Sequence, residues 1–127
     1  MLKLKPVNST YAQNDTIQLT PVFNTNNDFV LEDNIVSIKK AGYVEMDGYV
    51  TIVPTTAGAI SVNILVNGND FATITDYCGT ADPITIPLYD LFRVIPANLI
   101  NGYAKVQLQA GTASTISGGV VTFKYIR

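Results

Sequence analysis

Chemically reactive side chains are scarce in this sequence, and histidine is absent altogether. Histidine is the commonest general base and the commonest metal ligand, so its absence excludes a Ser-His-Asp or Cys-His catalytic site within the chain. Cys78 is the single cysteine, which excludes an intrachain disulfide and a zinc site built from several cysteines. We expect Cys78 to be a small buried side chain, with an interchain disulfide or a reactive thiol as alternatives.

Carboxylates are the remaining candidates for chemistry. Glu45 and Asp47 lie two positions apart on a predicted strand, so they share a face at a separation of about 7 Å. Glycosidases use paired carboxylates, but those normally face each other across a cleft, and we expect a solvated or inter-subunit polar face here. Asp70, Asp76 and Asp82 could offer oxygen ligands to calcium, although their spacing matches no calcium loop. The sequence therefore predicts a protein that is not an enzyme, with no metal site and no cofactor.

The composition indicates a protein that forms contacts with other proteins or with its own copies. The 127 residues fit a single domain spanning 1–127. Charged residues make up 14% of the chain, against about 25% in an average globular protein. A surface this poor in charge suits extracellular and virion proteins, and chains that bury much of themselves against their own copies. The net charge of −2 and the lack of a basic stripe predict no binding to nucleic acid.

Neither a leader nor a membrane span is evident. Residues 1–7 carry two lysines but are not followed by the apolar segment of a signal peptide. No apolar run approaches the roughly 18 residues of a membrane helix. We therefore expect a protein without a signal peptide that is not inserted in a membrane.

The element that must position any site is the segment 43–54, which alternates with a period of two. Four aliphatic residues face one way, at 44, 46, 50 and 52. The opposite face carries Glu45, Asp47 and Thr51, but also Tyr43, Tyr49 and Val53. Alternation of this kind predicts a strand with one face on a core. Further strands are predicted at 17–23, 34–38, 60–66, 71–77, 83–88, 104–110 and 119–127.

Turn signals separate these segments at short intervals. Asn67-Gly68 predicts a type I′ hairpin, and Asn101-Gly102 predicts another turn. Small residues predict a loop at 111–119, and an Asn- and Thr-rich stretch predicts a long flexible loop at 24–28. The segment 88–95 lies between two prolines, so strand or irregular structure is favoured there over a helix. Many short strands separated by turns predict a sandwich or a barrel.

Aromatic residues on two strands suggest a contact between subunits. Both faces of the 43–54 strand carry large apolar groups, so neither is simply wet, and tyrosine and phenylalanine are enriched in interface cores. The alternative is that these side chains belong to the ordinary core. The residues predicted for a subunit interface are Tyr43, Tyr49, Val53, Val121, Phe123 and Tyr125.

Three segments resemble one family of proteins. Residues 35–52, which include Gly42-Tyr43-Val44, resemble the Gly-Tyr-Tyr-x-Val/Ile strand of tumour necrosis factor-like and complement globular-head jelly rolls. Residues 57–69 resemble the next hairpin of that family, and residues 119–126 resemble its closing aromatic strand. Together with these motifs, the opening Met-Leu-Lys-Leu-Lys-Pro-Val-Asn resembles small proteins of this family from tailed bacteriophages and prophages.

The resemblance implies a fold, an assembly and a role. The fold would be an all-β, TNF-like jelly-roll β-sandwich of about ten antiparallel strands, and the assembly a homotrimer with both aromatic faces near its axis. The role would be a non-enzymatic phage or prophage virion structural protein, either an auxiliary capsid or head-fibre protein or a host-attachment component. Partners would be a capsid or other virion protein, or a receptor or glycan of the host surface. The proline-rich segment 76–95 departs from the family pattern, so loops there are expected to be particular to this chain.

A jelly-roll carbohydrate-binding or adhesion module is the alternative hypothesis. Such modules stack exposed aromatic rings on sugar rings, and tryptophan, the preferred platform, is absent from the chain. Tyr11, Phe29, Tyr77 and Tyr89 are the candidate platforms. A jelly-roll enzyme of the cupin type is disfavoured because its metal is held by histidine.

Overall fold

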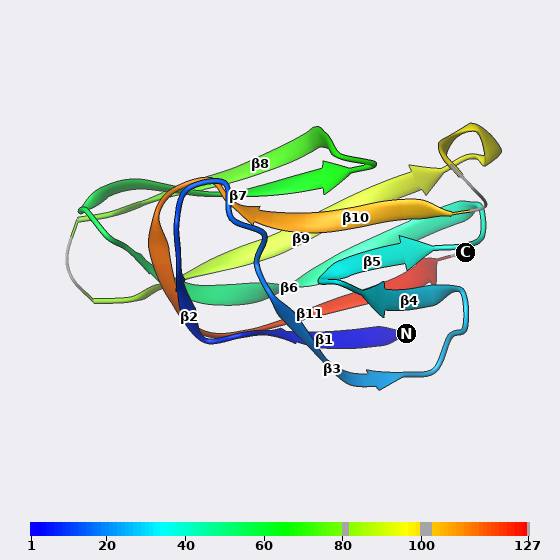
Figure 1. The fold of residues 1–127 in the computed structure, drawn as a ribbon, viewed down its shortest axis with the longest axis horizontal. Coiled ribbons are helices and arrows are strands. Elements are labelled where there is room, and N and C mark those ends of the chain that lie inside the picture. The colour runs from blue at the N-terminus through cyan, green and yellow to red at the C-terminus, as the bar shows by residue number, and fades with distance from the viewer. Residues whose placement is uncertain (80–81, 100–102, 127) are drawn as a thin grey trace.

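The computed structural model describes residues 1–79, 82–99 and 103–126, and these form two antiparallel β-sheets that face each other across one core (Figure 1). The larger sheet has the order β3-β1-β11-β6-β9, with β2 paired to β11, and the smaller has the order β4-β5-β10-β7-β8. The strands are β1 Leu2–Pro6, β2 Ser9–Tyr11, β3 Leu19–Asn24, β4 Phe29–Glu32, β5 Ile35–Ile38, β6 Gly42–Pro54, β7 Gly58–Val66, β8 Asn69–Cys78, β9 Ile84–Val94, β10 Ala104–Ala110 and β11 Ser114–Ile126. This is the expected jelly-roll β-sandwich.

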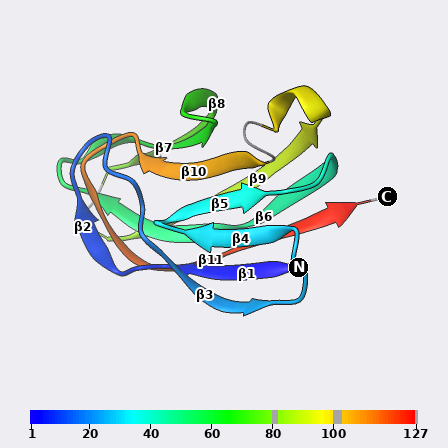
Figure 2. The ribbon, with the colours of Figure 1, turned by 45° about the vertical axis from the view of Figure 1, so that its right-hand side comes forward.

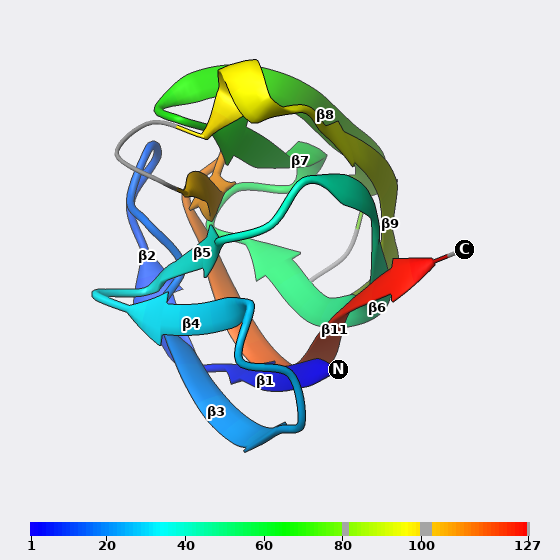
Figure 3. The same cartoon turned by 90° about the vertical axis from the view of Figure 1, so that its right-hand side faces the viewer.

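The first and last strands lie side by side in the larger sheet. β1 pairs antiparallel with β11, so Leu2 lies opposite Phe123, and the start of the chain lies beside the end of β11 (Figure 2). β11 in turn pairs with β6 along nearly its whole length. Viewed from one end, the strands of both sheets surround the core (Figure 3).

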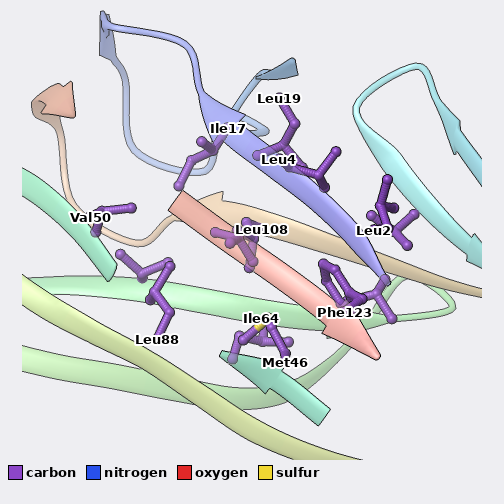
Figure 4. Close-up of a cluster of buried hydrophobic side chains, with 14 of the residues drawn as sticks. Leu2, Leu4, Ile17, Leu19, Met46, Val50, Ile64, Leu88, Leu108 and Phe123 are labelled. Carbon is purple, nitrogen blue, oxygen red and sulfur yellow. The ribbon is translucent and has the colours of Figure 1, made fainter. Parts of the chain in front are cut away.

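The alternation predicted for the 43–54 strand is confirmed. In β6, Val44, Met46, Val50 and Ile52 are fully buried, while Tyr43 and the other odd-numbered positions face outward. The inward residues of both sheets form one cluster, part of which Figure 4 draws around Met46, Leu108 and Phe123. Its largest members are Phe29, Phe123, Leu2, Leu4, Ile17, Ile38, Met46, Ile52, Ile60, Ile64, Ile86 and Leu88.

Glycine at position 48 allows β6 and β11 to approach each other. Gly48 has a φ of +158°, and a Cβ there would overlap the carbonyl oxygen of Val120. Glycine has no Cβ, so it accepts both the backbone angle and the close approach. The two central strands of the larger sheet therefore depend on this residue for their register.

The predicted Asn-Gly hairpin is confirmed between β7 and β8. Asn67 and Gly68 both have positive φ, 52° and 81°, as a type I′ turn requires. The Asn67 side chain donates to the carbonyl oxygen of Asn98 (2.9 Å) and accepts from the amide of Lys105 (2.9 Å). Cys78 is buried at the end of β8, as expected. The predicted Asn101-Gly102 turn lies outside the described residues.

Two predicted loops are shorter in the structure. Between β3 and β4, residues 25–28 form a compact turn, because Asn24 and Asn26 accept backbone amides two residues ahead, at 3.0 and 2.9 Å. The loop expected at 111–119 ends early, since β11 begins at Ser114 and takes in the glycines through a register shift after Ile116. The short strands β1, β2 and β4 are not among the strands predicted from alternation.

The proline-bounded segment 88–95 is mostly strand, as favoured. β9 runs through it to Val94, and a single 3-10 turn follows at Pro96–Asn98. β9 is an edge strand of the larger sheet, where a proline such as Pro87 is tolerated because one side of the strand needs no ladder hydrogen bonds. Within the described residues no helix is long and apolar enough to cross a membrane.

Candidate subunit interface

The outer face of the larger sheet gathers exposed aromatic and aliphatic side chains, and we call it the tyrosine face. It is built from three neighbouring strands, β9, β6 and β11, whose directly opposed residues point to the same side. Its members are Tyr43, Glu45, Asp47, Tyr49, Thr51 and Val53 of β6, Thr85, Pro87, Tyr89, Leu91 and Arg93 of β9, and Val120, Thr122 and Lys124 of β11.

Four large side chains of this face stand in solvent. Tyr43 is 49% exposed, Tyr49 44%, Tyr89 57% and Leu91 42%. Pro87 lies opposite Tyr49 and Tyr89 opposite Asp47, so Tyr49 and Tyr89 are diagonal neighbours within reach of each other. Tyr43 and Leu91 are diagonal neighbours in the same way. Contiguous exposed apolar surface of this kind is typical of interaction sites.

A polar cluster lies in the middle of the tyrosine face. The Glu45 carboxylate accepts from Lys124 Nζ at 3.3 Å and from the Tyr89 hydroxyl at 3.4 Å. The Thr122 hydroxyl donates to the carbonyl oxygen of Asp47 (3.0 Å). An ion pair and a phenol thus hold Glu45 in place, so it does not form a free carboxylate pair with Asp47.

The aromatic residues of the last strand face the other way. Val121 and Phe123 are fully buried in the core of one chain, so the prediction that they contact another subunit is wrong. The reason is the register of β11 on β6, which sets Val121 against Gly48 and Phe123 against Met46, on the core side.

Tyr125 also belongs to the inner face. Its ring stacks on Phe29, with 4.9 Å between the ring centroids, and its hydroxyl donates to the carbonyl oxygen of Lys40 (2.6 Å). Burial, and secondarily the negative charge of Asp28, raise the pKa of the Tyr125 hydroxyl. Of the six residues predicted for an interface, Tyr43, Tyr49 and Val53 lie on the tyrosine face.

Sequence reasoning missed the contribution of β9. Tyr89 and Leu91 were not among the predicted interface residues, because the prolines of the 83–96 segment obscured its strand character. The signal was present as alternation, since Ile86, Leu88, Phe92 and Val94 are buried and the residues between them are not.

Two of the four candidate sugar platforms are buried and two are exposed. Tyr11 and Phe29 are buried, so the prediction that they form exposed sugar platforms is wrong, and burial raises the pKa of Tyr11. Tyr77 is 70% exposed on β8, and Tyr89 belongs to the tyrosine face. Among the described residues no group of three or more Asp, Glu or Cys side chains could hold a metal ion.

The comparisons with known proteins agree on the fold. No protein-family model and no curated protein sequence matches the chain. Among solved structures, it is similar to murine APRIL at pH 5.0, with a TM-score of 0.75, 10% identity and 98% of both chains covered. The globular domain of zebrafish complement 1qA matches with a TM-score of 0.69 and 11% identity over 99% of this chain and 96% of that one.

A third similar structure is the PRD1 vertex protein P5. It has a TM-score of 0.64 and 15% identity, over 99% of this chain and 96% of that one. The chain therefore has the tumour necrosis factor-like jelly-roll fold, the class that the sequence motifs predicted. Identities of 10–15% establish the fold alone.

Proposed function

We propose that this chain is the subunit of a homotrimer that serves as a non-enzymatic virion structural protein of a phage or prophage. The trimer would act as an auxiliary capsid or head-fibre protein, or as a host-attachment component. The observation that carries the proposal is the tyrosine face, because three half-exposed tyrosines and a leucine on one sheet form a surface that gains by being covered.

The composition of the tyrosine face supports contact with further copies of the same chain. Tyrosine is enriched in interface cores because its ring buries a large area and its hydroxyl remains able to hydrogen-bond. The carboxylates of Glu45 and Asp47 are balanced on this face by Lys124 and Arg93, so equivalent faces can meet without a net like-charge repulsion. The low charged fraction of the whole chain is consistent with extensive self-burial.

The role on a virion rests on two supports. The first is the resemblance of the opening residues and the central motifs to small phage proteins of this fold. The second is the structural similarity to the PRD1 vertex protein P5. No group of acidic or cysteine side chains that could hold a metal ion is assembled among the described residues, and a scaffolding or attachment role requires none.

The solution mass tests the assembly. Light scattering behind a sizing column, at micromolar concentration, is expected to give about three times the 13.7 kDa of one chain. A stable monomer would overturn the proposed assembly and leave the tyrosine face to another partner. The virion role is tested separately, by immunogold labelling of particles produced from the source phage or induced prophage. Labelled particles would support it, and purified particles without the chain would refute it.

A further inference from the structure

A second site lies on the opposite side of the sandwich, on the outer face of the smaller sheet. There a cavity of about 240 Å³ lies over β4, β5 and β10. These three strands are neighbours in the smaller sheet (Figure 1). The strands set its side chains in rows, with Val30, Ser37 and Lys105 directly opposite one another. The lining is completed by Glu32, Asp33, Ile35, Lys39 and Tyr103.

The floor of this cavity holds a polar group that the fold itself does not use. Ser37 is only 9% exposed, and its hydroxyl makes no hydrogen bond within the described residues. The other buried serine, Ser114, donates to the carbonyl oxygen of Thr112 at 3.0 Å. Among the described residues, every side-chain N or O atom that is fully buried has a hydrogen-bond partner. The Ser37 hydroxyl has none, so it must be accessible, and it opens into the cavity that Ser37 lines. It is therefore available to a partner supplied from outside.

The charges around Ser37 are separated along the strands. Glu32 lies opposite Ile35 at one end of β5, with Asp33 beside it in the turn, while Lys39 lies four residues beyond Ile35, a distance of about 13 Å along the strand. Lys105 Nζ sits over the Tyr103 ring, 5.2 Å from the ring centroid. The single ion pair among the described residues is Lys124–Glu45, so no carboxylate neutralises either lysine of the cavity.

We propose that this cavity binds one carboxylate-bearing sugar residue, such as a uronic acid. The sugar carboxylate would lie between Lys39 and Lys105, where charge-assisted hydrogen bonds are available to it. Ring hydroxyls would bond to Ser37 and reach toward the carboxylates of Glu32 and Asp33, which accept hydrogen bonds. The apolar side chains of Val30 and Ile35 would contact the C–H face of the ring.

Size and charge spacing favour this ligand over other small solutes. Pockets for drug-sized ligands hold about 300–1,000 Å³, so a cavity of about 240 Å³ suits a single sugar ring. A free α-amino acid carries its ammonium and carboxylate groups on the same carbon atom, so the two charges cannot reach both ends of the cavity. A neutral sugar would leave the two ammonium groups without a counter-charge.

The site is independent of the proposed trimer. The tyrosine face belongs to the other sheet, so covering that face does not by itself cover the cavity. If the chain serves as a host-attachment component, as proposed above, this site would bind a glycan of the host surface. If the sugar does not bind, the solution mass of the protein is unchanged and the trimer proposal stands. If the protein is a monomer, the sugar site can still be tested.

The test is a titration of the isotope-labelled protein, followed by the amide signals in NMR. The probes are sodium galacturonate and galactose at matched ionic strength. We expect saturable shifts confined to β4, β5 and β10, with a dissociation constant for galacturonate of about 1–10 mM and at least about ten-fold weaker binding of galactose. Two results would overturn the proposal: equal binding of the two sugars, or no saturable shifts on addition of galacturonate, which would mean that the cavity holds only water.

Variants separate a binding role from a structural one. Ser37→Ala and Lys105→Gln are each expected to weaken galacturonate binding about ten-fold. Lys5→Gln, an exposed lysine of β1 in the other sheet, is the matched control and should bind as the wild type does. Because the Ser37 hydroxyl has no partner in the fold, Ser37→Ala should also keep or raise the Tm. Unchanged galacturonate binding in Ser37→Ala and Lys105→Gln would refute the assignment.

Discussion

Replacing Tyr49 by aspartate should dissociate the proposed trimer while leaving the folded chain intact. Tyr49 exposes 44% of its surface in one chain. A tyrosine side chain has roughly 200 Å² of surface, so covering this part would remove about 90 Å² from water. At about 25 cal/mol per Å² this contributes about 2 kcal/mol per subunit, and about 6–7 kcal/mol for three.

That loss is large enough to measure. A change of about 6–7 kcal/mol in a three-body equilibrium raises the concentration needed for assembly by roughly two orders of magnitude. Three aspartates must also lose water on assembly, which costs several kcal/mol for each ion and adds to the effect. We therefore expect Tyr49→Asp to elute at micromolar concentration with the 13.7 kDa mass of one chain.

The assay needs a control that carries the same change elsewhere. Tyr77 is more exposed than Tyr49 but lies on β8 of the smaller sheet, so Tyr77→Asp should keep the mass of the wild type. Far-ultraviolet circular dichroism should show the same strand content in both variants, since each tyrosine is exposed in the single chain. A Tyr49→Asp protein that remained a folded trimer would refute the assignment of the tyrosine face as the interface.

Three further changes probe the fold that carries these sites. Gly48→Ala should lower the free energy of unfolding by about 2–4 kcal/mol, because a Cβ there clashes with Val120 and the φ is positive. Gly118→Ala is the control and should cost little, since the nearest atom to a Cβ there lies 4.0 Å away. Urea unfolding measures both variants, and equal midpoints would contradict the argument. Asn67→Ala should lower the free energy of unfolding by about 1–3 kcal/mol, because two side-chain hydrogen bonds and a residue suited to positive φ are lost. Hydrogen exchange at the Lys105 amide should become faster, and an unchanged exchange rate there would refute this. Tyr125 has a pKa raised above 10.0, so the folded chain holds this proton more tightly than the unfolded chain and the resulting stability is lost as pH rises above 10. Wild type should therefore exceed Tyr125→Phe in stability at pH 8 by more than at pH 11 in urea unfolding, and a gap that widened with pH would contradict the assigned cause.

The sequence determined the fold class through features that are local. Period-two alternation in 43–54 predicted β6 and the inward side of Val44 and Met46, because a strand's side-chain period follows from its own backbone. The Asn67-Gly68 pair predicted the β7–β8 hairpin, because positive φ at both positions favours one turn type. The lack of histidine excluded whole classes of catalytic site from composition alone, because no folding of the chain can supply a missing imidazole.

Tertiary structure decided which faces meet and which remain exposed. Alternation along β11 placed Phe123 and Tyr125 together on one face, but only the register of β11 on β6 made that face the inner one. Local pattern contains no information on pairing between distant strands, so Tyr89 and Leu91 of β9 joined the tyrosine face unpredicted. The cavity at Ser37 has the same origin, since three strands from separate parts of the chain must pair before its row of side chains exists.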